Sequence, residues 1–140
     1  MIKFEIKGTP VAKGRPRLGK FGTYTPEKTK NYEELVKYTF KNKYPNFEPF
    51  KGELKAKLEF VFEVPKSYSK KKREALLPIE GIEHSGAGYT HKPDCDNLAK
   101  AVLDALNGLA YIDDSQITCL LAFKEYGYEA KAIVEIEEIG

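Results

Sequence analysis

Two pairs of acidic residues flank a lysine in the C-terminal half of the chain. Asp94 and Asp96 come first, Lys100 follows, and Asp113 and Asp114 come after a further short interval. Carboxylates placed close together repel one another, and a divalent cation removes that repulsion. Ligands that offer only oxygen atoms suit Mg²⁺ or Mn²⁺. Ions held in this way activate phosphate esters toward water, so the pattern indicates phosphate chemistry.

A helix over residues 95–107 is predicted to position most of these side chains. Asp94 is expected to cap its N-terminus, where negative charge is stabilised. Asp96 and Lys100 are four residues apart and share one helix face, and Asp104 lies near the same face. A short loop after the helix is expected to bring the second acidic pair beside it. The lysine then adds positive charge where a phosphoryl transition state accumulates negative charge.

Each of these residues also has an ordinary structural interpretation. Asp94 can be a helix cap only, Asp96 and Lys100 a surface ion pair, and the second acidic pair part of a turn. These interpretations do not explain why two acidic pairs and a lysine bracket one helix. An EF-hand is excluded because Leu98 stands where a third ligand is needed. A phosphate-binding loop is excluded because residues 86–89 lack its spacing and its Lys-Ser/Thr ending.

Three neighbouring segments carry a resemblance to a known family: Lys92–Lys100 (KPDCDNLAK), Asp104–Gly108 (DALNG) and Tyr111–Ile117 (YIDDSQI). Together they resemble the RusA family of crossover junction endodeoxyribonucleases, or Holliday junction resolvases, in its prophage-type form. The resemblance extends more loosely over the whole chain. It includes Gly8-Thr9-Pro10, the basic Gly14-Arg15-Pro16-Arg17 and Tyr24-Thr25-Pro26.

The resemblance implies roles for individual residues. Asp94, Asp96 and Asp114 match the metal-binding aspartates, and Lys100 matches the catalytic lysine. Asp113 and Asp104 also match acidic positions. We rank Asp113 below Asp114 as a ligand, because adjacent residues in an extended segment face opposite ways. Asp104 is expected to support the ligands from behind.

The resemblance further implies an activity and its partners. The expected function is a Mg²⁺-dependent endodeoxyribonuclease, with Mn²⁺ as an alternative ion, that resolves four-way DNA junctions by paired symmetric nicks during recombination and repair. A homodimer is expected, because its two-fold axis matches the near-symmetry of the junction. Two alternatives remain open at this point. One is a non-catalytic protein that binds branched DNA, and the other is a nuclease that acts on flaps or forks.

Charge is distributed unevenly along the chain. Residues 1–45 contain eleven Lys/Arg and four Asp/Glu, whereas residues 93–140 contain three Lys/Arg and ten Asp/Glu. The basic part includes four residues set among glycines, which are predicted to contact DNA phosphates: Lys13, Arg15, Arg17 and Lys20. Phe21 and Tyr24 lie among them and are suited to stacking on exposed bases. The alternative is a solvated, flexible loop.

Composition limits the remaining classes. A length of 140 residues, 41% of them hydrophobic, favours a single domain over residues 1–140. No apolar run approaches the roughly 18 residues of a membrane span, so no membrane partner is expected. Cys95 and Cys119 lack metal-finger spacing and support no disulfide framework. These features favour a cytoplasmic protein.

Periodicity predicts an α+β fold, a small mixed or antiparallel sheet with two main helices packed on it. The resemblance implies that this arrangement is RusA-like. The predicted strands are 2–6, 53–64, 116–126 and 129–138, and the last two are expected to form a hairpin around Gly127. Helices are predicted from Thr25-Pro26 to Tyr44, after Ser69, and over 95–107. Residues 8–26 are expected to be an irregular loop. The apolar face of 54–64 or the terminal hairpin is either ordinary core or the dimer contact.

Overall fold

The computed structural model describes residues 1–140, except for the side chain of Arg17, so the predicted DNA contact of that residue lies outside the described part. The chain contains three α-helices, α1 (Glu27–Lys43), α2 (Lys70–Leu76) and α3 (Cys95–Leu106). The main strands are β1 (Ile2–Lys7), β4 (Leu54–Glu63), β5 (Ile117–Gly127) and β6 (Lys131–Glu138). Two short strands, β2 (Arg17–Gly19) and β3 (Gly22–Tyr24), form a separate ribbon.

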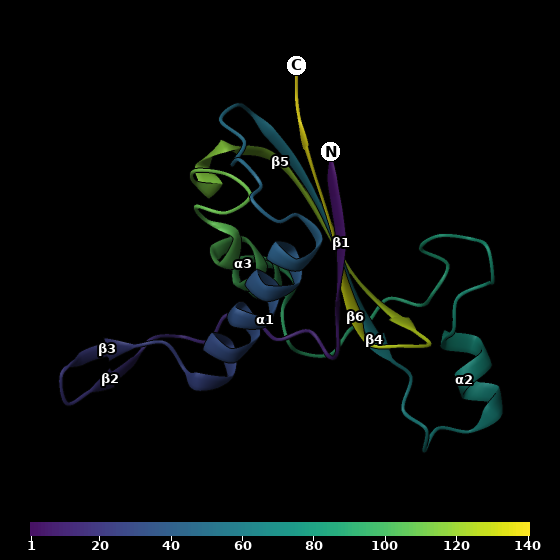
Figure 1. The fold of residues 1–140 in the computed structure, drawn as a ribbon. Helices are drawn as coiled ribbons and strands as arrows, with labels where there is room; N and C mark the ends of the chain where they lie inside the picture. Colours follow the sequence, from purple (N-terminus) through teal and green to yellow (C-terminus); the bar gives the residue numbers. More distant parts are fainter.

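The four main strands form one mixed sheet in the order β1-β6-β4-β5. β6 runs antiparallel to both β1 and β4, whereas β5 runs parallel to β4. The helices α1 and α3 cover one face of this sheet, and α2 lies away from them at the far end (Figure 1). The α+β prediction, with a small mixed sheet and two main helices, is therefore confirmed.

The strand β4 lies at the centre of the hydrophobic core. Leu54, Ala56 and Leu58 are fully buried, and the residues between them point to the other face of the sheet. Only a strand with one covered face requires this period of two. The buried face joins the core with Val36 of α1 and Leu98 of α3. The apolar face of residues 54–64 is thus core, and it is not available as a dimer contact.

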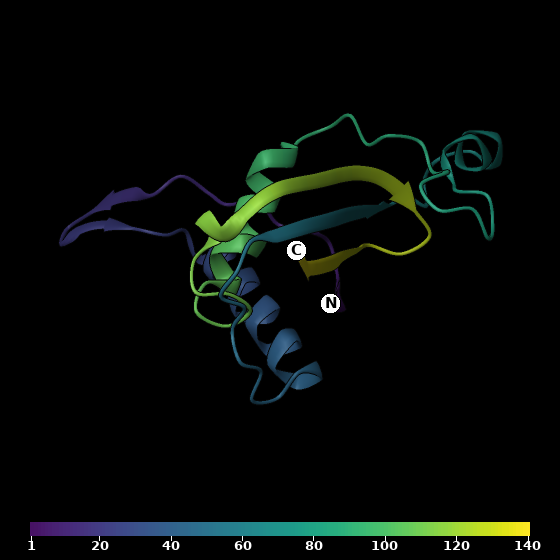
Figure 2. The same cartoon turned by 90° about the horizontal axis from the view of Figure 1, so that it is seen from above.

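The prediction of a terminal hairpin is wrong. β5 and β6 each pair with β4, which lies between them. The connection from β5 to β6 passes around the end of β4 (Figure 2). Gly127 lies so close to Val61 of β4 that a β-carbon on it would collide with the valine side chain. The glycine that suggests a turn serves instead to let two strands approach closely.

The predicted irregular loop 8–26 contains an unpredicted ribbon. β2 and β3 pair with Leu18 opposite Thr23 and project from the body of the protein (Figure 1). Leu18 and Phe21 on this ribbon are 87% and 98% exposed. Large apolar side chains this exposed contribute nothing to the core.

The helix boundaries follow the predictions closely. Pro26 rather than Thr25 takes the capping position of α1, and no side chain caps that helix. Ser69 caps α2 by accepting a hydrogen bond of 3.2 Å from the backbone N–H of Lys72. α3 ends at Leu106 with Asn107 as its C-cap, and Gly108 follows with a φ of 79°. No helix in the described chain has the length and apolar character needed to cross a membrane.

The close contact at Gly127 generates a test of the strand order. Replacing Gly127 with Ala is expected to lower the free energy of unfolding by about 1–3 kcal/mol, because the new methyl group overpacks the contact with Val61. Urea denaturation measures this change. Gly52→Ala is the matched control, because open space surrounds that position. Equal stability of the two variants would contradict the close contact between Gly127 and Val61.

Candidate active site along helix α3

Asp94 and Asp96 stand at the start of α3. Asp94 occupies the predicted capping position, and its backbone oxygen accepts a hydrogen bond of 3.1 Å from Leu98 N–H. Its carboxylate, however, makes no capping hydrogen bond. Asp96 lies exposed in the first turn and accepts a hydrogen bond of 2.9 Å from Asn97 N–H. The helix cap alone therefore does not explain Asp94, whose carboxylate remains available for a ligand.

A lysine that the sequence analysis did not single out positions this end of the helix. Lys124 Nζ donates hydrogen bonds to the backbone oxygens of His91, at 2.8 Å, and Pro93, at 2.9 Å. It also lies 5.7 Å from the ring of Tyr89, which stacks on Phe62 of β4. Lys124 thus ties the segment that presents Asp94 to the sheet. The sequence offered one sign of this role, because Lys124 is a charged residue at a strand position that faces the helices.

Lys100 pairs with Asp104 and not with Asp96. Its Nζ lies 3.4 Å from Asp104 Oδ2. The Nζ of Lys13 lies 3.3 Å from the same oxygen and 2.8 Å from Glu33 Oε1. Burial lowers the pKa of Lys13, but the two carboxylates outweigh burial and leave it raised. Asp104 therefore contacts two lysines, and one of them is Lys100, the predicted catalytic lysine. These contacts accord with the supporting role predicted for Asp104.

The second acidic pair forms a single turn of 3₁₀-helix, η1 (Asp114–Gln116). Asp113 caps this turn by accepting a hydrogen bond of 3.1 Å from Ser115 N–H, and these hydrogen bonds with Ser115 lower the pKa of Asp113. The Gln116 side chain accepts from Asp113 N–H and donates to the backbone oxygens of Phe50 and Gly52. Gln116 therefore anchors the turn, a role that the sequence motif did not reveal.

Asp114 lies at the other end of α3. Its backbone N–H donates a hydrogen bond of 2.9 Å to the side chain of Asn107, the residue that ends the helix. The 12 residues of α3 correspond to about 18 Å at 1.5 Å per residue. The loop thus returns Asp114 to the C-terminal end of the helix only. Within one chain, Asp94 and Asp96 stand at the start of α3, and Asp114 lies at its other end.

Comparison with known proteins assigns the family. The family model described as Endodeoxyribonuclease RusA matches residues 7–137 of the chain. The chain belongs to the RusA family. It is also 35% identical over 142 residues to a protein of Bacillus subtilis (strain 168) named "Uncharacterized protein YqaN", an alignment that covers 99% of this chain and 96% of the relative. The resemblance found in the sequence is confirmed, and it places the chain among DNA endonucleases.

The start of α3 lies beside a cavity whose lining includes three basic residues. This cavity of about 680 Å³ lies between the loop before β2 and the segment before α3. Arg15, Lys28 and Lys92 contribute to its lining, and Pro93, next to Asp94, also faces it. Three basic residues thus lie around the cavity next to the N-terminal end of α3. The predicted DNA-binding residues Arg15 and Lys20 are exposed, whereas the Lys13 side chain is only 19% exposed and is paired with carboxylates.

The Lys124 contacts predict a positioning effect. Lys124→Met keeps the apolar stem but removes both hydrogen bonds, so it is expected to destabilise the segment before Asp94 by about 1.5–3 kcal/mol. Amide hydrogen exchange over residues 86–94 should accelerate while exchange in α1 stays unchanged. Lys131→Met is the control, because the ammonium group of that lysine pairs with Glu5, at 3.5 Å, and not with the segment before α3. Identical exchange in the two variants would refute the role assigned to Lys124.

Proposed function

We propose that this RusA-family protein is a Mg²⁺-dependent endodeoxyribonuclease that resolves four-way DNA junctions by paired symmetric nicks in recombination and repair. One observation carries the proposal. The Asp94 carboxylate stands at the start of α3 without a capping hydrogen bond, with Asp96 in the same turn and Lys100 one turn further along. A basic groove lies directly beside this end of the helix.

The donor set fits a hard cation. Asp94 and Asp96 offer carboxylate oxygens, which Mg²⁺ prefers and which Mn²⁺ also accepts. Cys95 lies between them, but burial raises the pKa of its thiol, and a protonated thiol is a poor metal ligand. When bound there, the ion would polarise the scissile phosphate and activate a water for attack. The protein's own contribution is to hold the two carboxylates at a helix end fixed by Lys124.

We place the third ligand, Asp114, on a second copy of the chain. Asp94 and Asp114 lie toward opposite ends of α3, so one chain does not gather all three carboxylates. In a homodimer, a two-fold axis that crosses near the middle of α3 brings each end of one helix to the opposite end of the other. Asp114 of the partner subunit then completes the site of Asp94 and Asp96. Asp113 is a weaker candidate, because its carboxylate caps η1.

Lys100 is assigned to the phosphate. Its side chain is 59% exposed, and Asp104 holds its ammonium group on the outer face of α3. From there the ammonium group can neutralise charge that develops on the phosphate oxygens. Asp104 acts as a positioning residue in this arrangement, because its contact is with the lysine.

DNA is proposed to bind across the groove and the projecting ribbon. Arg15, Arg17 and Lys20 are assigned to phosphates, whereas Lys13 is left to brace α3 because it is already paired with Glu33 and Asp104. Phosphate contacts give affinity without sequence preference. Phe21, at the tip of the ribbon and 98% exposed, is suited to stack on bases that are unpaired at a branch point.

The catalytic assignment predicts a separation of binding from cleavage. Asp94→Asn and Asp96→Asn are each expected to reduce junction cleavage in Mg²⁺ more than about a hundredfold, because loss of a metal ligand exceeds the cost of losing its supporting contacts. Junction affinity should be kept or improved, because repulsion of phosphates falls. Gel cleavage and gel shift assays on a four-way junction, a flap and a duplex measure both effects. Glu137→Gln, a surface change on β6, is the control.

The outcomes of that assay discriminate the alternatives. Paired nicks confined to the junction support resolution, whereas preferential cleavage of the flap would assign a different branched substrate. Junction binding without cleavage by the unmodified protein would indicate a binding protein only.

The shared site predicts complementation between inactive variants. When Asp94→Asn and Asp114→Asn chains are refolded together, each mixed dimer keeps one intact site, made from the unaltered Asp94 of one chain and the unaltered Asp114 of the other. Nicking of one strand at the junction should reappear. A mixture of Asp94→Asn and Asp96→Asn should stay inactive, because both sites are damaged. If the first mixture is as inactive as its components, the ligands are not shared between chains.

A further inference from the structure

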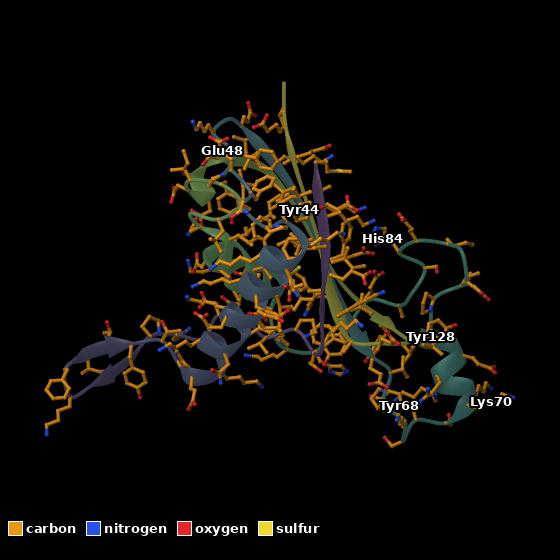
Figure 3. All side chains as sticks on the ribbon, in the orientation of Figure 1. Tyr44, Glu48, Tyr68, Lys70, His84 and Tyr128 are labelled. Carbon is orange, nitrogen blue, oxygen red and sulfur yellow. The ribbon has the colours of Figure 1, made fainter. Side chains whose placement is uncertain are left out.

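A second group of metal-ligating side chains lies on the opposite face of the sheet from the helices. Glu59 of β4 and Glu125 of β5 are neighbours on two parallel strands, where Glu59 is level with Phe123 and Val61 with Glu125. His84 comes from the long loop between α2 and α3 and lies over this face, away from α1 and α3 (Figure 3). The nuclease function proposed above uses none of these three residues.

The three side chains converge on one point. His84 Nδ1 lies 2.9 Å from Glu59 Oε1 and 3.4 Å from Glu125 Oε1. The three residues each offer one ligand atom, and these three atoms lie within 4.8 Å of one another. Two ligands bound tetrahedrally to one Zn²⁺ at about 2.1 Å stand about 3.4 Å apart. The observed separations are thus close to those that a single ion requires.

Burial makes the cluster unfavourable without a positive charge at its centre. The side chains of Glu59 and Glu125 are only 16% and 12% exposed. Both carboxylates lie within 3.4 Å of the His84 imidazole. Two carboxylates buried this close together need either a proton or a cation between them.

The contacts around His84 hold its loop in a defined conformation. The Ser85 hydroxyl accepts a hydrogen bond of 2.7 Å from Ile79 N–H, and it also contacts the backbone oxygens of Ile79 and Ile82. The Tyr128 hydroxyl donates to the Pro78 oxygen at 3.3 Å. The His84 ring also packs against Phe123, with centroids 4.6 Å apart. The imidazole is therefore directed at the carboxylates by its own loop as well as by the sheet.

We propose that Glu59, His84 and Glu125 bind one transition-metal ion of the Zn²⁺ class. One imidazole nitrogen with two carboxylates suits Zn²⁺ better than Mg²⁺, because imidazole favours the softer ion. A cavity of about 340 Å³, lined by Ile82, Tyr128 and the three ligands, adjoins the cluster and leaves room for a water as fourth ligand. The ion would fasten the loop that leads to Asp94 onto the sheet, as a structural clip remote from the proposed catalytic carboxylates.

The test uses a protein whose catalytic carboxylates are disabled. In an Asp94→Asn/Asp96→Asn chain, Co²⁺ and Zn²⁺ added one at a time are expected to bind in one equivalent at pH 7.5, by calorimetry. Bound Co²⁺ should give the visible absorption of a four-coordinate site. Zn²⁺ should also raise the melting temperature and slow amide exchange over residues 77–93. Mg²⁺ at the same concentration should do neither.

Variants locate the ion. His84→Ala and Glu125→Gln, each added to that chain, should lose the bound equivalent, the absorption and the melting shift. His91→Ala removes the other histidine and should retain all three. Glu125→Gln nearly preserves side-chain volume, so it separates loss of the ion from loss of the fold. Binding that survives both His84→Ala and Glu125→Gln would overturn the proposal. The proposal would also be overturned if the folded Asp94→Asn/Asp96→Asn chain bound no ion. In that case a proton would bridge the two carboxylates.

Discussion

Repulsion between carboxylates constrains where acidic side chains stand in this protein. The C-terminal third is strongly acidic, and two of the carboxylates near α3 have local partners. Asp104 contacts two lysines, and Asp113 accepts hydrogen bonds in the turn that it caps. Asp94 and Asp96, in contrast, both stand at the start of α3, and neither has a lysine partner among the ion pairs of the described residues. The helix N-terminus offsets part of their charge, and a bound cation would offset the rest.

The central position of β4 decides how this acidic helix is presented. Both edges of β4 are paired, so β5 takes the outer edge and carries Lys124 to the segment before α3. A hairpin between β5 and β6 would place β5 elsewhere and leave the backbone oxygens of His91 and Pro93 without this donor. The close approach at Gly127 is therefore connected to the candidate site through strand order. Its effect on that site would be indirect, through the position of one helix end.

Local patterns predicted the elements well and their partners poorly. The alternation in β4 and the cap and glycine at the two ends of α3 are set by neighbouring residues, so the sequence alone indicates them. Strand pairing depends on residues distant in sequence, and Gly127 looks the same whether it turns a chain or admits a neighbouring strand. Lys13 shows the same limit for charge. It was predicted to contact DNA because it lies in a basic run, but Glu33 is 20 residues away and pairs with it.

The separation of Asp94 from Asp114 depends on the length of α3 and on the direction of the loop that follows it. The sequence predicts the length of the helix, but it does not predict the direction of the loop. That separation has an energetic consequence under the function proposed here. A single chain avoids collecting three carboxylates, and so avoids their repulsion in the absence of an ion. When two chains contribute to each site, ion binding and dimer formation stabilise one another by mass action. Two sites then assemble together on one two-fold axis, and an isolated subunit has none. An enzyme that must cut two strands of a junction gains from this coupling, because a single subunit cannot leave an unpaired nick.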